Sequence, residues 1–159
     1  MKQIRCTVNG QSRQSDRLDQ SLLVFLRDQL GLTGAKLSCG EGGTTLRFLL
    51  ARACPVLFDG VDVRACVTPL TDAADRTVMT IEGLAVDGAL HPLQQAFLDA
   101  DAFQCGYCTP GMIMAALALL QHSPVPTPRE IATHMAGNLC RCGMYARIIE
   151  AIQQVVAHE

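Results

Sequence analysis

Short apolar runs alternate with turn signals in the first half of the chain, a pattern typical of β-strands. Apolar side chains alternate with polar ones from Ile4 to Val8, and Asn9-Gly10 follows as a hairpin turn. Apolar residues over 22–30 recur at helical spacing and predict one helix. Asp59-Gly60 marks a second hairpin, and 78–81 is expected to be a further strand. This order predicts an α+β fold with a mixed sheet.

The second half has the periodicity of helices. Prolines at 92 and 110 stand where a helix begins, and the run 112–120 is apolar on all sides, which predicts a buried helix. Thr127 and Glu130 fit a capping box, and an apolar stripe over 148–156 predicts a last helix. We divide the chain into domains of residues 1–75 and 76–159.

The composition narrows the classes of protein to which the chain belongs. Of 159 residues, 49% are hydrophobic and 18% are charged, which excludes a disordered protein. A net charge of −2 without a basic run argues against a nucleic-acid partner. The longest apolar run is far shorter than the roughly 18 residues of a membrane span, and the polar start contains no signal-peptide core. We therefore expect a soluble cytoplasmic protein, or one exported together with a partner that carries a signal.

Cysteine is the most informative residue type. Eight cysteines in a chain without a signal peptide favour metal ligands over secreted disulfides. Cys105-x-x-Cys108 precedes the predicted buried helix, and Cys140-x-Cys142 lies between the last two helices; two such loops can complete a four-sulfur site. A redox dithiol fits poorly, because that motif uses one pair after a strand. Zinc and iron–sulfur both stay open on spacing alone.

Longer motifs around these cysteines resemble one family. The runs QCGYCTPG at 104–111 and GNLCRC at 137–142 resemble the iron–sulfur subunit of the molybdenum hydroxylases, which include xanthine dehydrogenase, aldehyde oxidase and isoquinoline oxidoreductase. The runs GAK at 34–36, SCGEG at 38–42 and VLFDG at 56–60 resemble the plant-type ferredoxin half of the same family. The resemblance covers nearly the whole chain.

The resemblance implies a β-grasp, plant-type ferredoxin-like domain followed by a four-helix domain, each with one [2Fe–2S] cluster. It also implies a large partner subunit that carries molybdopterin, with a flavin subunit or a cytochrome as electron acceptor. The ligands of the C-terminal cluster would be Cys105, Cys108, Cys140 and Cys142. Gln104 would approach the partner's pterin. The run GMY at 143–145, in place of x-Gly-Tyr, resembles the isoquinoline-oxidoreductase branch.

The N-terminal cluster site departs from the family pattern, Cys-Gly-x-Gly-x-Cys-Gly-x-Cys followed by a more distant fourth cysteine. Cys39, Cys54 and Cys66 match the first, third and fourth ligands, but the second is absent. Thr44 occupies its position counted from Cys39, and a neutral hydroxyl is a poor substitute for a thiolate. The apolar stretch 46–53 replaces the loop that would wrap the iron. A [2Fe–2S] cluster takes four ligands, so we expect no stable cluster here and less order over 40–53.

Three functions follow from these patterns. The leading hypothesis is an electron-transfer subunit that takes electrons from a molybdenum centre in its partner and passes them to an acceptor. The first alternative is a zinc-stabilised interaction module without a redox role. The second is a structural subunit with a single cluster and an incomplete electron path.

Overall fold

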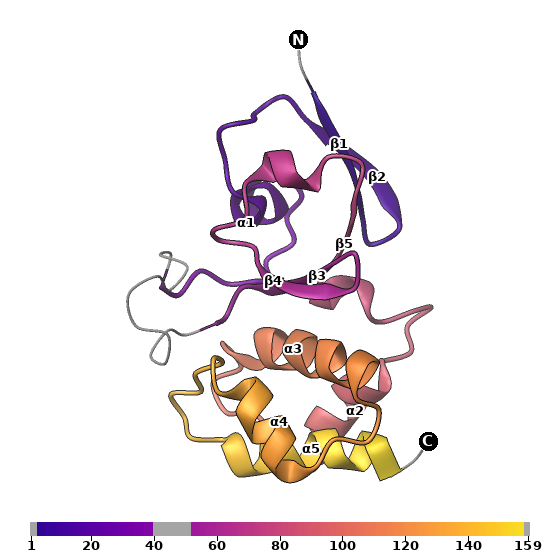
Figure 1. Cartoon of the computed structure of the whole chain (residues 1–159), viewed down its shortest axis with the longest axis vertical. Helices are drawn as coiled ribbons and strands as arrows, with labels where there is room; N and C mark the ends of the chain where they lie inside the picture. The colour runs from indigo at the N-terminus through magenta and orange to yellow at the C-terminus, as the bar shows by residue number, and fades with distance from the viewer. Residues whose placement is uncertain (1–2, 40–51, 158–159) are drawn as a thin grey trace.

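The computed structural model describes residues 3–39 and 52–157. Within these residues, a five-stranded sheet lies on one side of a group of helices, giving a mixed α/β structure (Figure 1). The strands are β1 (Ile4–Val8), β2 (Gln11–Ser15), β3 (Pro55–Phe58), β4 (Val61–Arg64) and β5 (Thr77–Met79). The α-helices are α1 (Leu22–Val24), α2 (Pro92–Asp99), α3 (Thr109–His122), α4 (Pro128–Met135) and α5 (Tyr145–Ala157).

Two hairpins form the outer parts of the sheet, whose strand order is β2-β1-β5-β3-β4. β1 pairs with β2 and β3 pairs with β4, both antiparallel, across turns in which Asn9, Gly10, Asp59 and Gly60 have positive φ. Asn-Gly and Asp-Gly turns adopt this left-handed conformation readily. β5 joins the hairpins, parallel to β1 and antiparallel to β3. Both predicted hairpins and the mixed sheet are confirmed, and the sheet includes a strand just past residue 75.

The predicted helix over 22–30 packs its apolar side against the sheet. It begins as α1, capped by the Ser21 side chain, and continues as a π-helical turn over Phe25–Gln29. Leu22 and Leu26 are fully buried in a core that also contains Cys6, the residue of β1 that the strand pattern places inside. The helix is confirmed, although its wider last turn has no signature in the hydrophobic pattern.

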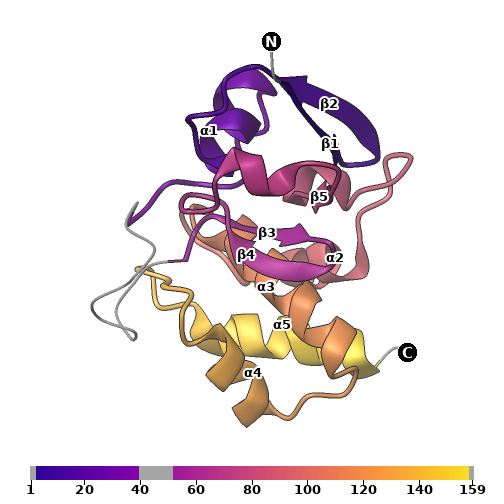
Figure 2. The same cartoon turned by 45° about the horizontal axis from the view of Figure 1, so that its top comes forward.

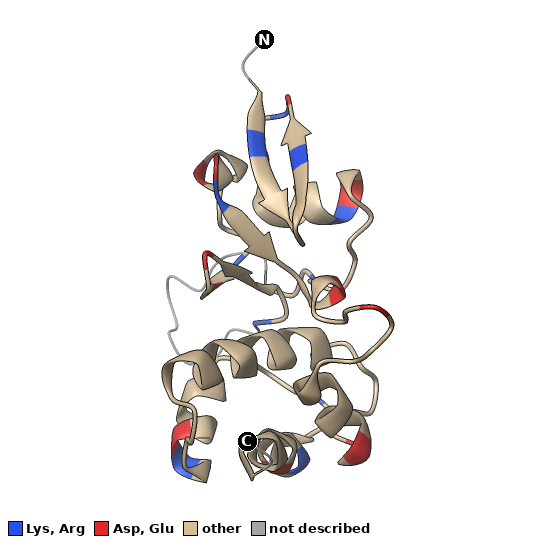
Figure 3. Ribbon diagram, turned by 90° about the vertical axis from the view of Figure 1, so that its right-hand side faces the viewer, with Lys and Arg blue, Asp and Glu red and all other residues tan. Residues whose placement is uncertain are grey.

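α3 is the central element of the helical half. Figure 3 shows it without a charged residue, and eight of its residues are buried. β3 and β4 lie against one side of α3 in Figures 1 and 2, α2 and α4 pack against it, and α5 packs against α2 and α4. The predicted buried helix is confirmed because neighbours cover it on several sides. No helix in the described ranges is long and apolar enough to cross a bilayer.

Local capping fixes where two helices begin. The Glu130 N–H donates to the Thr127 hydroxyl at 3.3 Å, and the Thr127 N–H donates to the Glu130 carboxylate at 2.7 Å. This is the capping box that the sequence predicts for α4. His91 opens α2 in a similar way, since its ring accepts from the Leu93 N–H and its own N–H donates to Gln94. Histidine is not among the preferred capping residues, so the sequence did not indicate this cap.

Candidate metal centre

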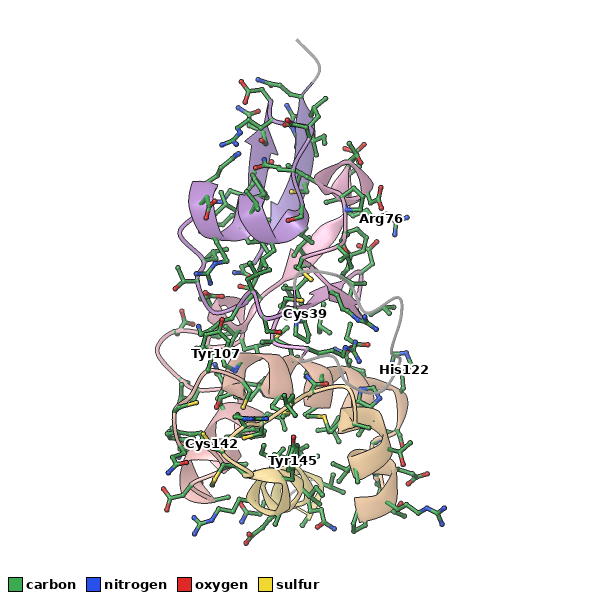
Figure 4. The ribbon with its side chains drawn as sticks, turned by 90° about the vertical axis from the view of Figure 1, so that its left-hand side faces the viewer. Cys39, Arg76, Tyr107, His122, Cys142 and Tyr145 are labelled. Carbon is green, nitrogen blue, oxygen red and sulfur yellow. The ribbon has the colours of Figure 1, made fainter. Side chains whose placement is uncertain are left out.

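Four cysteines of the helical half come from two loops. Cys105 and Cys108 lie between α2 and α3, with Cys108 directly before α3 begins. Cys140 and Cys142 lie between α4 and α5. The four cysteines differ in burial. Cys140 is buried, Cys108 and Cys142 are partly exposed, and Cys105 is exposed. Figure 4 shows Cys142 in the helical half of the molecule.

The four thiols meet in two pairs, and each pair joins one loop to the other. Cys105 interacts with Cys142, and Cys108 interacts with Cys140. The two pairs also interact electrostatically with each other. The charges of Cys105 and Cys140 both raise the pKa of Cys108 and the pKa of Cys142. The structure therefore brings the two loops together, with each cysteine of one loop paired with a cysteine of the other.

The surroundings of the sulfurs raise the pKa of some of these cysteines and lower the pKa of another. Burial, followed by the hydrogen bond to Cys140 and the charges of Cys140 and Cys105, raises the pKa of Cys108 to about 12. The Tyr107 backbone N–H, followed by the Cys142 thiol, lowers the pKa of Cys105. The Cys105 N–H favours the Cys142 thiolate, but the bond to the Cys105 sulfur, burial and nearby charges together raise the pKa of Cys142. Binding of a metal at Cys108 would release a proton at neutral pH.

Backbone geometry in both loops holds the cysteines in place. Gly106 and Gly143 have φ values of +76° and +77°, a left-handed conformation that favours glycine. The Gly143 N–H donates to the Cys140 carbonyl at 3.1 Å, and the Cys140 N–H donates to the Tyr145 hydroxyl at 2.9 Å. Tyr145 thus gives a partner to the N–H of a buried cysteine. The run GMY at 143–145 does not by itself predict this contact.

The donor set fits a [2Fe–2S] cluster. Such a cluster takes four cysteine thiolates, and the chain offers four thiols in two close pairs. A single zinc ion needs its four sulfurs around one point at about 2.3 Å. Across residues 3–39 and 52–157, no group of three or more metal-ligating side chains is arranged around a single ion. Four thiols in two pairs match the number of cysteine ligands that a two-iron cluster takes.

The outer face of the 105–108 loop is accessible to another molecule. Gln104 is exposed directly before Cys105, and Tyr107 is 48% exposed. An apolar groove begins beside Gly106 and is lined by residues that include Leu98. The groove thus lies beside Gly106, the residue that directly follows exposed Cys105.

The N-terminal half brings two of its predicted ligands into contact. Cys54, directly before β3, is buried, and its Sγ lies 3.3 Å from the Sγ of Cys66, which follows β4. Cys39 is partly exposed at the end of the described segment 3–39, where the two halves meet (Figure 4). Thr44 and the altered loop up to residue 51 lie outside the described residues. The remaining cysteine of this half, Cys6, is buried in β1, and burial raises its pKa.

These thiols do not fit a [2Fe–2S] cluster, for which four cysteine ligands are needed. Cys39, Cys54 and Cys66 supply three, and Cys6 belongs to the packed core of the sheet. The site in this half is therefore incomplete in cysteine ligands.

The two halves are joined close to both groups of cysteines. The Asn138 amide, 1% exposed, donates to the Arg52 carbonyl at 3.1 Å and to the Gly111 carbonyl at 3.2 Å. The Arg52 N–H donates to the Gly137 carbonyl at 3.1 Å, and the Arg52 side chain pairs with Asp62. Sequence reasoning missed Arg52 and Asn138 because they are 86 positions apart and no local pattern connects them.

The sequence of the chain is similar to a known family model and to known iron–sulfur proteins. Residues 80–153 match the model of the "[2Fe-2S] binding domain". The chain is 44% identical over 154 residues to the nicotinate dehydrogenase small FeS subunit of Eubacterium barkeri, covering 96% of this chain and 94% of the relative. It is 46% identical over 136 residues to the alpha subunit of isoquinoline 1-oxidoreductase of Brevundimonas diminuta, covering 86% and 84%. These matches define an iron–sulfur protein.

Solved structures agree with the sequence matches. Quinoline 2-oxidoreductase from Pseudomonas putida 86 superimposes with a TM-score of 0.90 at 36% identity, covering 99% of this chain and 94% of that chain. Aldehyde oxidoreductase from Desulfovibrio gigas superimposes with a TM-score of 0.88 at 36% identity, and the match covers 17% of its longer chain. The chain therefore belongs to the family of iron–sulfur subunits of the molybdenum hydroxylases.

Proposed function

We propose that this chain transfers electrons to an acceptor from a molybdenum centre in a large partner subunit. The convergence of four thiols in two pairs carries the proposal. The residues that would hold the cluster are Cys105, Cys108, Cys140 and Cys142. A [2Fe–2S] cluster supplies a one-electron couple in such a site.

The chain's own groups adjust the charge that the sulfurs carry. The Tyr107 backbone N–H lowers the pKa of Cys105, and the Cys105 backbone N–H favours the thiolate form of Cys142. Such donors stabilise negative charge on sulfur and therefore favour the reduced state. The buried position of Cys140 limits the access of water to this ligand.

The exposed face of the 105–108 loop is the contact surface that we propose for the molybdopterin-binding subunit. Gln104 is exposed on it, and we propose that it approaches the pterin of the partner. The neighbouring groove is apolar, and exposed Leu98 and Phe103 border it. Apolar surface of this kind is typical of permanent interfaces. A flavin subunit or a cytochrome would be the acceptor.

The proposal also assigns the architecture of the family to the chain. The sheet with α1 corresponds to a β-grasp, ferredoxin-like domain, and α2 to α5 correspond to the four-helix domain. The predicted boundary after residue 75 stays a prediction, and the matched family model begins at residue 80.

Purification of the native complex through a tag on this chain tests the function. We expect a brown complex in which a large molybdenum-containing subunit copurifies, with about two irons per copy of this chain. Substrate should reduce the iron–sulfur absorption band. A colourless chain that contains zinc and has no large partner would refute the proposal.

A narrower role is supported by the incomplete N-terminal site. A chain with a single cluster lacks the second carrier that its family uses, so the natural acceptor would be reduced slowly. Iron analysis separates the two cases. Four irons per chain, with two paramagnetic signals after reduction, would show that another ligand completes the N-terminal site.

A further inference from the structure

The N-terminal half holds two thiols in contact at the place where the cluster site is incomplete. The Sγ atoms of Cys54 and Cys66 lie 3.3 Å apart. We infer that Cys54 and Cys66 form a thiol–disulfide pair, which a small disulfide such as oxidised glutathione converts into an intrachain disulfide. The inference concerns these two residues and does not rest on the role of the four cysteines of the helical half.

The β3–β4 hairpin holds both residues at its open end. Cys54 directly precedes β3, whose first residue, Pro55, is paired with Arg64 at the end of β4. The ladder continues with the Ala65 N–H, which donates to the Cys54 carbonyl at 3.2 Å, and Cys66 is the next residue. A disulfide has a sulfur–sulfur distance of about 2.05 Å, so the two sulfurs need to approach by about 1.3 Å. Because the ladder holds the backbone on both sides, we expect rotation of the two side chains to supply this movement.

The other cysteines leave this pair available for thiol chemistry. A [2Fe–2S] cluster would use both thiols, but it takes four ligands and this half has only Cys39 besides them near the site. Cys6 is 2% exposed in the core of the sheet, and the other four cysteines lie in the loops of the helical half. Cys39 is the thiol that could compete for a mixed disulfide, and a control therefore has to remove it.

The reaction begins at Cys66, because Cys66 is partly exposed and Cys54 is 2% exposed. The Cys66 thiolate attacks one sulfur of oxidised glutathione, whose S–S bond breaks, and one glutathione thiolate leaves with the electron pair. Cys54 then attacks the Cys66 sulfur of the mixed disulfide and releases the second glutathione. The two thiol protons pass to the two glutathione thiolates. The pair loses two electrons, and one glutathione disulfide gains them.

Trypsin provides a direct test, because it cleaves after Arg52, Arg64 and Arg76 and leaves the two cysteines in separate peptides, 53–64 and 65–76. The full chain, in its native complex, is equilibrated with fixed ratios of oxidised and reduced glutathione, quenched with acid, blocked with N-ethylmaleimide and digested without reductant. We expect a linked species of the two peptides, about 2 Da lighter than the sum of the two free thiol peptides. Dithiothreitol should abolish it.

Two variants separate this pair from other thiol chemistry. Cys39→Ser should retain the linked species at the same glutathione ratio. Cys54→Ser should instead trap glutathione on peptide 65–76, because the thiol that resolves the mixed disulfide is gone. In Cys66→Ser, the linked species should be lost.

The inference fails if the folded wild-type chain forms no linked species at any glutathione ratio. It also fails if the chain contains four irons, because Cys54 and Cys66 would then be cluster ligands. A linked species in a chain that contains no iron would support the thiol pair and refute the proposed electron-transfer role.

Discussion

The Tyr107 hydroxyl donates a 2.5 Å hydrogen bond to the carbonyl oxygen of Leu37, 70 positions earlier in the chain. The Lys36 ammonium group lies 5.9 Å from the centre of the same ring. Tyr107 stands between Cys105 and Cys108, and Leu37 stands two residues before Cys39. A side chain from the proposed cluster loop thus contacts the segment that carries the first N-terminal cysteine.

Removing each tyrosine hydroxyl should have unequal effects on stability. Tyr107→Phe loses a hydrogen bond at an exposed site, and we expect the free energy of unfolding to fall by about 0.5–1 kcal/mol. Tyr145→Phe leaves the N–H of buried Cys140 without its acceptor, so we expect a larger loss of about 1–3 kcal/mol. Urea titration of both variants checks the order. A larger effect for Tyr107→Phe would contradict our account of the 140–142 loop.

Each of the four paired cysteines should be necessary for the cluster. We expect Cys108→Ser and Cys142→Ser to lose the iron of the helical half and its visible absorption, because a neutral hydroxyl does not replace a thiolate ligand. Cys6→Ala serves as the control, since Cys6 lies in the sheet core. Iron analysis and absorption spectra give the result. Full iron and an unchanged spectrum in either serine variant would show that the ligand assignment is wrong.

Asn138 should contribute to stability through both of its hydrogen bonds. Asn138→Ala leaves the buried carbonyls of Arg52 and Gly111 without this donor, so we expect a loss of about 2 kcal/mol in the free energy of unfolding. Gln153→Ala removes an exposed amide from α5 and should change stability by less than about 0.5 kcal/mol. Equal effects in a urea titration would mean that the Asn138 contacts do not stabilise the junction of the halves.

The capping box of α4 should make stability depend on pH. The Thr127 backbone N–H, followed by its hydroxyl, lowers the pKa of Glu130 from its ordinary 4.5. A carboxyl whose folded pKa is depressed stabilises the folded state above its unfolded pKa, and this contribution is lost as the pH falls through the folded pKa. We therefore expect the stability difference between wild type and Glu130→Gln to be constant near pH 6 and to shrink below about pH 4.5.

Urea midpoints at a series of pH values measure this difference. Glu150→Gln changes an exposed glutamate of α5 and is the matched control. A wild-type advantage over Glu130→Gln that grows on acidification would contradict the capping account. It would mean that the ionised carboxylate does not stabilise the start of α4.

The elements that the sequence predicts correctly are those whose causes are local. Asn9-Gly10 and Asp59-Gly60 favour tight turns by their own backbone preferences, and both hairpins form there. Thr127 and Glu130 carry the capping box within four residues. The spacing of the four paired cysteines likewise indicates two chelating loops before any fold is known.

Other features depend on contacts between distant segments. Cys105 is paired with Cys142 rather than with its loop neighbour Cys108, and this arrangement depends on the packing of α2 against α5 and of α3 against α4. The π-helical turn at Phe25–Gln29 likewise has no signature in the hydrophobic spacing. The junction of Asn138 with Arg52 depends on the docking of the sheet on α3. Local patterns contain no information about these partners.

The absence of a side chain at Gly111 limits which protein halves could replace either half of this chain. A Cβ there would lie 3.1 Å from the Arg52 carbonyl oxygen and from Pro55 Cδ, and 3.2 Å from Ala53 Cα. The backbone before β3 and the start of α3 therefore pack closely, and a side chain at position 111 would require its neighbours to move by a few tenths of an ångström. A chimera that takes one half from another protein would need a matching backbone over 52–55 and a glycine at position 111. The two halves are thus fitted to each other at this contact, and a change in one backbone calls for a matching change in the other.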